Sequence, residues 1–178
     1  MPPVPVDFSI RSLLRLTSER GTLFEGYRAS WSELPAAEQW NVVDSVANVM
    51  RGMHAHLGYD EFYLLLAGTA RLGLCDTRPG SPTEGATLEV ALDGAVPQLV
   101  TMPRGIMHGI YSETAGRLLV GMNREWDGSG QTGCHWSDPE LGLSWKLSPV
   151  QISAEDDALP PLREVRAMIP RFQPRPAS

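Results

Sequence analysis

Three of the four histidines in this 178-residue chain and one glutamate occur at spacings that favour a metal site. His54 and His56 stand two residues apart, and on a β-strand this spacing places both imidazoles on one face. Glu61 follows five residues later, and His108 stands in another expected strand. Three imidazoles and one carboxylate suit a divalent transition metal. The residue types do not choose among Fe(II), Mn(II), Ni(II), Cu(II) and Zn(II).

Short runs of β-forming residues surround these side chains. The 17 glycines and 15 prolines interrupt the chain too often for long helices. Strands are predicted over residues 61–67, 69–75, 87–92, 98–102, 106–112 and 117–123. The link Ala67-Gly68 predicts a hairpin between the first two, and short helices are predicted over 32–39 and after Ser153. The pattern predicts one all-β domain over residues 1–178, a sandwich or jelly-roll barrel, with a flexible tail from about residue 170.

Composition limits the classes of partner. The formal net charge of −6 and the pI near 5.2 argue against a nucleic-acid or anionic-membrane surface. Cys75 and Cys134 lie too far apart for a disulfide framework or a metal-binding spacing, which indicates a reducing, cytoplasmic setting. The first residues do not resemble a signal peptide, and no apolar stretch approaches the roughly 20 residues that span a bilayer. We therefore expect a soluble protein with a small-molecule partner.

The candidate ligands fall into two motifs. Residues 54–68 read His-x-His-x4-Glu-x6-Gly, and residues 103–108 read Pro-x-Gly-x2-His. Both resemble the metal-ligand motifs of the cupin superfamily in residue type and spacing. The resemblance implies a cupin jelly-roll β-barrel with short peripheral helices and a metal inside, held by His54, His56, Glu61 and His108.

Further motifs point to a narrower family. They cover residues 20–25, 51–54, 103–109, 136–145 and 152–160, in that order. Together they resemble the dTDP-4-dehydrorhamnose 3,5-epimerase family from about residue 17 to residue 162. This resemblance implies a homodimeric jelly roll that inverts carbons next to the ketone of a nucleotide-linked sugar, without a metal.

The second resemblance also implies roles for single residues. His54 matches the base that removes the α-proton, and Asp156 matches the carboxylate that orients this base. His108 matches a pocket residue near the oxyanion, and Arg51 one near the diphosphate.

Three further residues are candidate substrate contacts. Arg20 and Glu25 match nucleotide contacts that reach into the neighbouring subunit. Trp126 is the tryptophan that we consider for stacking on a base or sugar, because an aromatic ring offers a flat apolar face.

Three positions depart from the epimerase pattern. Glu61 stands in place of a lysine that stabilises the enolate, and His56 in place of a glutamine. Val120 falls near the tyrosine that reprotonates the other face. Glu61 beside an oxyanion is repulsive without a cation between them, so a divalent ion could replace the lysine as a Lewis acid.

This replacement raises a conflict at His54. A histidine that binds metal through the nitrogen that takes the proton cannot also act as the base. Asp156 would then hold His54 in its ligating tautomer.

Three functional hypotheses remain open from the sequence. The leading one is an enzyme that isomerises or epimerises a keto-sugar, or another carbonyl-bearing small molecule, through a metal-stabilised enolate. The second is a metal-dependent cupin oxygenase or cyclase of secondary metabolism, which would consume oxygen with Fe(II). The third is a non-catalytic cupin that binds sugar or metal. Activity that persists without metal would instead favour ordinary epimerase chemistry through His54 and Asp156.

Overall fold

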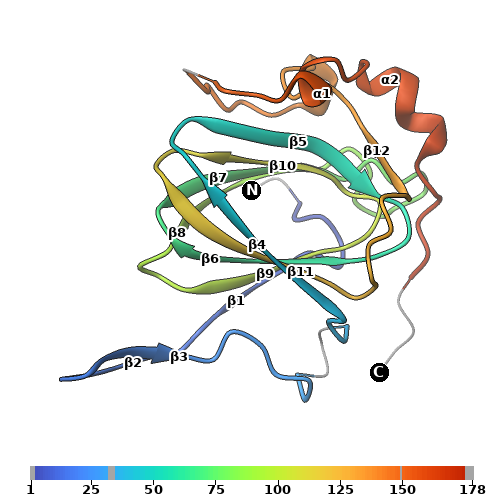
Figure 1. Cartoon of the computed structure of the whole chain (residues 1–178). Helices are drawn as coiled ribbons and strands as arrows, with labels where there is room; N and C mark the ends of the chain where they lie inside the picture. The colour runs from blue at the N-terminus through green and yellow to red at the C-terminus, as the bar shows by residue number, and fades with distance from the viewer. Residues whose placement is uncertain (1–2, 32–34, 149, 175–178) are drawn as a thin grey trace.

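Two antiparallel sheets face each other in the computed structural model, which describes residues 3–31, 35–148 and 150–174 (Figure 1). Sheet I contains, in order across the sheet, β1 (Ser9–Ser12), β9 (Gln98–Met102), β6 (Glu61–Ala67), β11 (Gly116–Met122) and β4 (Gln39–Ser45). Sheet II contains β12 (Gln131–Gly133), β5 (Val49–His56), β10 (Met107–Ser112), β7 (Thr69–Cys75) and β8 (Thr87–Asp93). This arrangement confirms the predicted all-β jelly roll.

Smaller elements flank the two sheets. They are the strands β2 (Arg15–Ser18) and β3 (Gly21–Phe24) and the short helices η1 (Pro139–Leu141), α1 (Ala154–Asp157), α2 (Leu162–Val165) and η2 (Arg166–Met168). The predicted helix after Ser153 is confirmed, since the Ser153 hydroxyl caps α1 by accepting the Asp156 N–H at 3.1 Å. The helix predicted over 32–39 is wrong where the chain is described: residues 35–38 are not helical and β4 begins at Gln39. Residues 32–34 lie outside the described residues.

The hairpin predicted at Ala67-Gly68 is also wrong. β6 and β7 have the predicted bounds but belong to different sheets, so the two residues carry the chain from one sheet to the other. Gly68 has a φ of +82°, and a Cβ there would lie 2.6 Å from the Ala115 carbonyl oxygen. Successive strands of a jelly roll often alternate between sheets, and turn length alone does not distinguish this crossing from a pairing.

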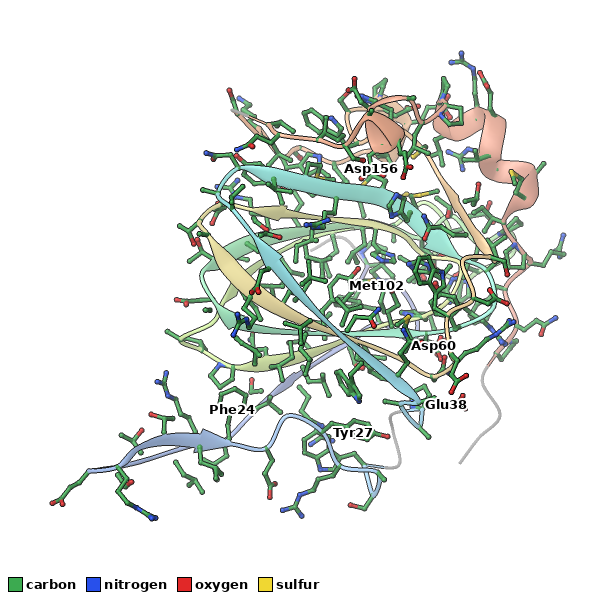
Figure 2. All side chains as sticks on the ribbon, in the orientation of Figure 1. Phe24, Tyr27, Glu38, Asp60, Met102 and Asp156 are labelled. Carbon is green, nitrogen blue, oxygen red and sulfur yellow. The ribbon has the colours of Figure 1, made fainter. Side chains whose placement is uncertain are left out.

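Three apolar clusters fix which way each strand faces. The outer face of sheet I packs under the N-terminal segment, and the outer face of sheet II packs under the segment after β12. Between the sheets lies a third cluster, which includes Tyr63 and Met102. Met102 is labelled inside the barrel in Figure 2. Side chains alternate along a strand, so residues between outward-facing neighbours point into the barrel.

The C-terminal segment stays in contact with the barrel as far as Phe172. The Phe172 N–H donates to the Pro79 carbonyl at 3.0 Å, and the Arg78 guanidinium lies 4.9 Å from the centre of the Phe172 ring. Residues 175–178 of the predicted flexible tail lie outside the described residues. Within the described part of the chain, no helix is long and apolar enough to cross a membrane.

Candidate active site

Three of the four predicted metal ligands meet inside the barrel. His56 ends β5, Glu61 begins β6 and His108 lies in β10, and all three side chains are buried. Glu61 Oε2 lies 3.0 Å from His56 Nε2 and 2.9 Å from His108 Nε2. One nitrogen or oxygen from each residue falls within 4.8 Å of the other two. Two strands of sheet II and one of sheet I therefore bring a two-histidine, one-carboxylate group to one point, called here the interior triad.

The hydrogen bonds of the two histidine nitrogens that face away from Glu61 determine which ring nitrogens of the interior triad carry protons. His108 Nδ1 lies 3.0 Å from the Ile106 carbonyl, which only accepts, so this nitrogen carries a proton. In neutral His108 the lone pair of Nε2 then faces the Glu61 carboxylate at 2.9 Å. Two lone pairs at this distance repel each other unless a cation, either a proton or a metal ion, lies between them.

His56 satisfies its contacts without an extra proton. The Tyr59 hydroxyl lies 2.7 Å from His56 Nδ1 and can donate to it, which leaves the Nε2 proton directed at Glu61. Burial lowers the pKa of His56, although Glu61 partly offsets this effect. Burial by itself would raise the pKa of Glu61, but a hydrogen bond from His108, when that ring carries both protons, and one from His56 hold it well below its usual range. Glu61 is therefore ionised, and its buried negative charge requires a positive charge nearby.

Two tyrosines at this site were not predicted from the sequence. The Tyr63 hydroxyl lies 3.1 Å from His108 Nε2 and 3.3 Å from Glu61 Oε2, and the Tyr59 ring stacks on His56. Burial raises the pKa of both hydroxyls, so both keep their protons. Tyr63 follows Glu61 by two residues on the same strand, and the two-residue alternation of a strand would have placed it on the same face.

Backbone contacts hold the ends of these strands together. The Asp60 carboxylate accepts the Arg104 N–H at 2.9 Å and the Asn123 amide at 3.2 Å, and Gly105 N donates to the His56 carbonyl at 2.7 Å. The turn before β10 is thereby tied to the ends of β5, β6 and β11. These contacts fix the separation of the three triad residues. Asp60 is labelled at the right side of the barrel in Figure 2.

A second set of contacts, organised around a buried carboxylate, also holds the turn before β10. Thr77 donates to the Gly105 carbonyl at 3.1 Å, and the loop that carries Thr77 is organised around Asp76. The fully buried Asp76 accepts from Arg78 at 2.8 and 2.9 Å and from the hydroxyls of Ser81 and Thr83 at 2.7 Å each. Burial would raise the pKa of Asp76, but these hydrogen bonds lower it.

Replacing Asp76 by asparagine should lower the free energy of unfolding at pH 7 by about 3 to 5 kcal/mol, because the buried Arg78 loses its counter-ion. The pKa of Asp76 is lower in the folded state than the value of about 3.9 expected when unfolded, so its stabilisation is complete above that value. It is lost as the pH falls through the folded pKa. Urea denaturation at pH 7 and pH 3 should therefore show a smaller difference between wild type and variant in acid.

The exposed pair Asp44–Arg117 provides the control for this measurement. Its shortest distance is 2.7 Å, close to that of Asp76 and Arg78, but both side chains are more than half exposed. Replacing Asp44 by asparagine should change stability far less than replacing Asp76, because solvent screens an exposed ion pair. Equal losses at Asp76 and Asp44 would contradict the structural role of the buried pair.

His54 is not a member of the interior triad, and its role as the fourth metal ligand remains a prediction. Its Nε2 lies 2.7 Å from Asp156 Oδ1, and Asp156 Oδ2 accepts the Gly52 N–H at 3.2 Å. Asp156 comes from α1, which lies above β5 (Figure 2). Although His54 contacts Asp156 in α1, the alternation of side chains along β5 places it on the barrel side of the strand. Its neighbours Met53 and Ala55 both pack in the outer cluster.

The His54–Asp156 pair has the polarity of a base and its orienting carboxylate. Burial would raise the pKa of Asp156, but hydrogen bonds from His54 and Gly52 lower it, so Asp156 is ionised and accepts the proton of His54 Nε2. His54 Nδ1 then carries the lone pair. The His54 side chain is 24% exposed, whereas those of the triad histidines are below 10%. A substrate or solvent can therefore reach His54 more easily than the triad.

The four predicted substrate contacts come from different elements, and Arg51, on β5, is one of the groups that lower the pKa of Asp156. Arg20 occupies the exposed turn between β2 and β3, and Glu25 pairs with Arg28 through Nε at 2.7 Å. Arg51 lines a hollow of about 10 Å³, room for about one water molecule. Trp126 is half exposed, and its backbone N–H donates to the Gln39 side chain at 2.9 Å. The roles of these four residues remain predictions.

Comparison with known proteins identifies relatives over most of the chain. The chain is 27% identical over 184 residues to the dTDP-4-dehydrorhamnose 3,5-epimerase of Mycobacterium tuberculosis, covering 96% of this chain and 91% of that protein. It is 25% identical over 140 residues to the spore coat polysaccharide biosynthesis protein SpsL of Bacillus subtilis, covering 76% and 93%. Both alignments span most of each partner.

Solved structures agree with this relationship. The dTDP-6-deoxy-D-glucose-3,5-epimerase of Legionella pneumophila, in complex with dTDP-4-keto-L-rhamnose, superposes with a TM-score of 0.87 at 28% identity. This match covers 94% of this chain and 95% of that one. A 3'-monoepimerase from Streptomyces bikiniensis in complex with dTDP also gives 0.87, at 21% identity over 97% and 93%, which supports the fold. The model of the dTDP-4-dehydrorhamnose 3,5-epimerase family matches residues 7–164, so the chain belongs to this family of cupin-like epimerases.

Proposed function

We propose that this protein epimerises a carbon next to the ketone of a nucleotide-linked keto-sugar, with His54 as the base. The observation that carries the proposal is the 2.7 Å contact between His54 and the ionised Asp156. It directs the lone pair of His54 to Nδ1, on the barrel side of β5. The dTDP-sugar complex of the Legionella relative supports a dTDP-linked 4-keto-sugar as the substrate class.

The interior triad would stabilise the negative charge that develops on the substrate. The family lysine that could do so is replaced by Glu61, and this carboxylate needs a cation between it and His108. Ligand atoms that share a tetrahedral or octahedral ion at about 2.1 Å lie roughly 3.0 to 3.4 Å apart, close to the spacings from Glu61 to the two histidines. The residues present therefore fit a divalent transition metal.

His56, Glu61 and His108 would hold this ion, and His54 would remain free to act as the base. The bound ion would supply Lewis-acid polarisation of the substrate carbonyl. Tyr59 can accept a hydrogen bond from His56 Nδ1 as well as donate one, so it accommodates the tautomer in which His56 Nε2 is a ligand. Separate residues for metal and proton remove the conflict that the sequence raised at His54.

The triad also supports a second candidate function. Two histidines and one carboxylate with open positions are the donor set of non-haem Fe(II) oxygenases. Oxygen uptake by the Fe(II)-loaded protein with a metabolite, without exchange of α-protons of any keto-sugar, would favour that function over epimerisation.

Hydrogen–deuterium exchange tests the epimerase proposal. In deuterated water, the full-length protein should introduce deuterium next to the ketone of a dTDP-linked 4-keto-6-deoxyhexose and invert that carbon, both measurable by NMR. A protein that binds this sugar without exchanging any α-proton would contradict the proposal.

We also propose that the protein acts as a homodimer through the β2–β3 arm. This hairpin projects away from the barrel (Figure 1) and exposes the facing pair Leu16 and Leu23, at 55% and 60%. An isolated two-stranded hairpin is at best marginally stable in water, so a second copy that covers the arm would stabilise it. Arg20 at the tip could then reach the partner's substrate.

Replacing Leu16 and Leu23 together by aspartate should convert the dimer into a monomer, because the arm would bury two charges without partners. Sedimentation velocity of the full-length chain checks this. Replacing Val96, which is 59% exposed in the turn after β8, should leave the dimer intact. A monomeric wild type would contradict the homodimer and the roles predicted for Arg20 and Glu25.

A further inference from the structure

We infer that Ser137 is the nucleophile of a second catalytic site, which transfers the acyl group of a carboxylic ester to water. This site does not depend on the proposed epimerase function. It lies in the segment after β12, which covers the outer face of sheet II, whereas His54 is on the barrel side. The inference starts from the contacts that Ser137, His135 and Asp157 make with one another.

The hydrogen bonds of His135 determine which of its ring nitrogens accepts a proton. The backbone N–H of Ser137 lies 3.3 Å from His135 Nδ1 and can only donate, so Nδ1 carries the lone pair. The Ser137 hydroxyl, 2.8 Å from the same nitrogen, then donates to it. The ring proton is therefore on Nε2, which lies 3.6 Å from Asp157 Oδ1. A serine that donates to a histidine, with a carboxylate facing the other nitrogen, is the arrangement of an activated nucleophile.

Backbone contacts hold this group in place. The His135 N–H donates to the Pro160 carbonyl at 3.0 Å, and the Asp138 N–H donates to the His135 carbonyl at 3.0 Å. Asp157 comes from α1, shortly before Pro160, so the same contact that anchors His135 brings the carboxylate beside it. The contact of Asp157 with His135 is longer than a hydrogen bond, and contacts of this kind often tighten when a substrate binds. Asp157 is therefore a positioning residue, which acts through His135.

A groove beside Ser137 offers room for the ester. It has a volume of about 280 Å³, and its lining includes Trp136, Ser137, Trp145 and Lys146. Both tryptophans pack in or against the outer cluster of sheet II, so the walls are fixed. Aromatic faces pack well on flat rings, which favours the ester of a ring-bearing alcohol. Lys146 is the single lysine of the chain, and its ammonium group would stabilise the negative charge that develops on the ester carbonyl oxygen.

The bonds and protons balance over two steps, with water as the second substrate. The Ser137 oxygen bonds to the carbonyl carbon while its proton passes to His135 Nδ1. The ester C–O bond then breaks, and this proton moves to the leaving alcohol. Water next attacks the acyl-serine as His135 takes its proton, which returns to the Ser137 oxygen when the acid is released.

Hydrolysis of p-nitrophenyl acetate tests this inference. The full-length protein should release p-nitrophenol faster than buffer alone, and mass spectrometry of peptides from the quenched reaction should find an acetyl group on Ser137. Ser137→Ala should fall to the buffer rate. His135→Asn should lose most of the rate above buffer, because a positioned general base contributes about 10²-fold or more. Asp157→Asn should lower kcat and leave KM unchanged, because Asp157 orients His135 and does not touch the ester.

Ser129 provides the matched control. It is also exposed, but its hydroxyl donates to Asp127 at 2.6 Å instead of to a histidine, so Ser129→Ala should hydrolyse the ester like the wild type. Acetylation of Lys146 in place of Ser137, or hydrolysis by Ser137→Ala at the wild-type rate, would overturn the inference. A wild type no faster than buffer would also overturn it. Exchange of α-protons in the keto-sugar should be unchanged in Ser137→Ala, so the failure of either function can be recognised separately.

Discussion

Replacing His54 by asparagine is expected to slow both α-proton exchange and epimerisation by roughly 10²- to 10⁴-fold, the usual contribution of a positioned general base. Asparagine can still donate to Asp156, but it has no basic lone pair to replace His54 Nδ1. The measurement is the rate of deuterium incorporation into the dTDP-linked keto-sugar, together with the rate of inversion. Loss of inversion alone would instead assign His54 to the reprotonation step.

His135 provides the control for this variant. It lies in the C-terminal segment, where its Nδ1 contacts the Ser137 hydroxyl at 2.8 Å, and His135→Asn should exchange protons like the wild type. Asp156→Asn should slow exchange as well, since an amide no longer fixes the tautomer with the lone pair on Nδ1. Activity unchanged in Asp156→Asn would contradict the orienting role of this carboxylate.

Replacing Glu61 by glutamine is expected to remove a bound transition metal from the protein. Loss of a partner that only orients a ligand costs about 10- to 100-fold in metal affinity, and loss of the ligand itself should cost at least as much. Metal content after purification without chelator, measured by mass spectrometry, should fall from near one equivalent to trace. At free metal 100 times the Kd, the wild type should gain about 2.7 kcal/mol of stability, and the variant should not.

His54→Asn is the informative partner of Glu61→Gln. His54 is not a member of the interior triad, so its replacement should leave the metal content unchanged while activity is lost. Metal lost from both variants would restore the four-ligand set that the sequence suggested. A wild type without metal, even after reconstitution, would leave a proton as the cation between His108 and Glu61.

The sequence predicted the central strands because their signal is local. β-Forming runs bounded by glycine or proline mark β6, β7 and β9 with the observed bounds. β2 and β3 were missed because this exposed arm has no apolar alternation, and its pairing depends on neither barrel sheet. The wrong hairpin between β6 and β7 has a different cause: sheet membership is decided by distant strands, which a two-residue link does not report.

As with the strands, the part of the site that could be predicted is the part with a local signal in the sequence. The two-residue spacing and the cupin-like motifs brought His56, Glu61 and His108 together correctly. The separation of His54 from them required Asp156, whose place beside β5 depends on how a segment about 100 residues later packs on the sheet. Tyr63 was missed because an aromatic residue in a strand is usually a core residue. Only its hydrogen bonds show that it belongs to the site.

The position of Asp156 has a consequence for when the protein becomes competent during its synthesis. Every strand of both sheets has been made by residue 133, but the carboxylate that fixes the tautomer of His54 follows more than twenty residues later, in α1. A nascent chain released from the ribosome as far as β12 would contain the barrel wall and all three triad residues, with His54 still unoriented. With His54 as the proposed base, proton abstraction would therefore require a segment that is made after both sheets are complete.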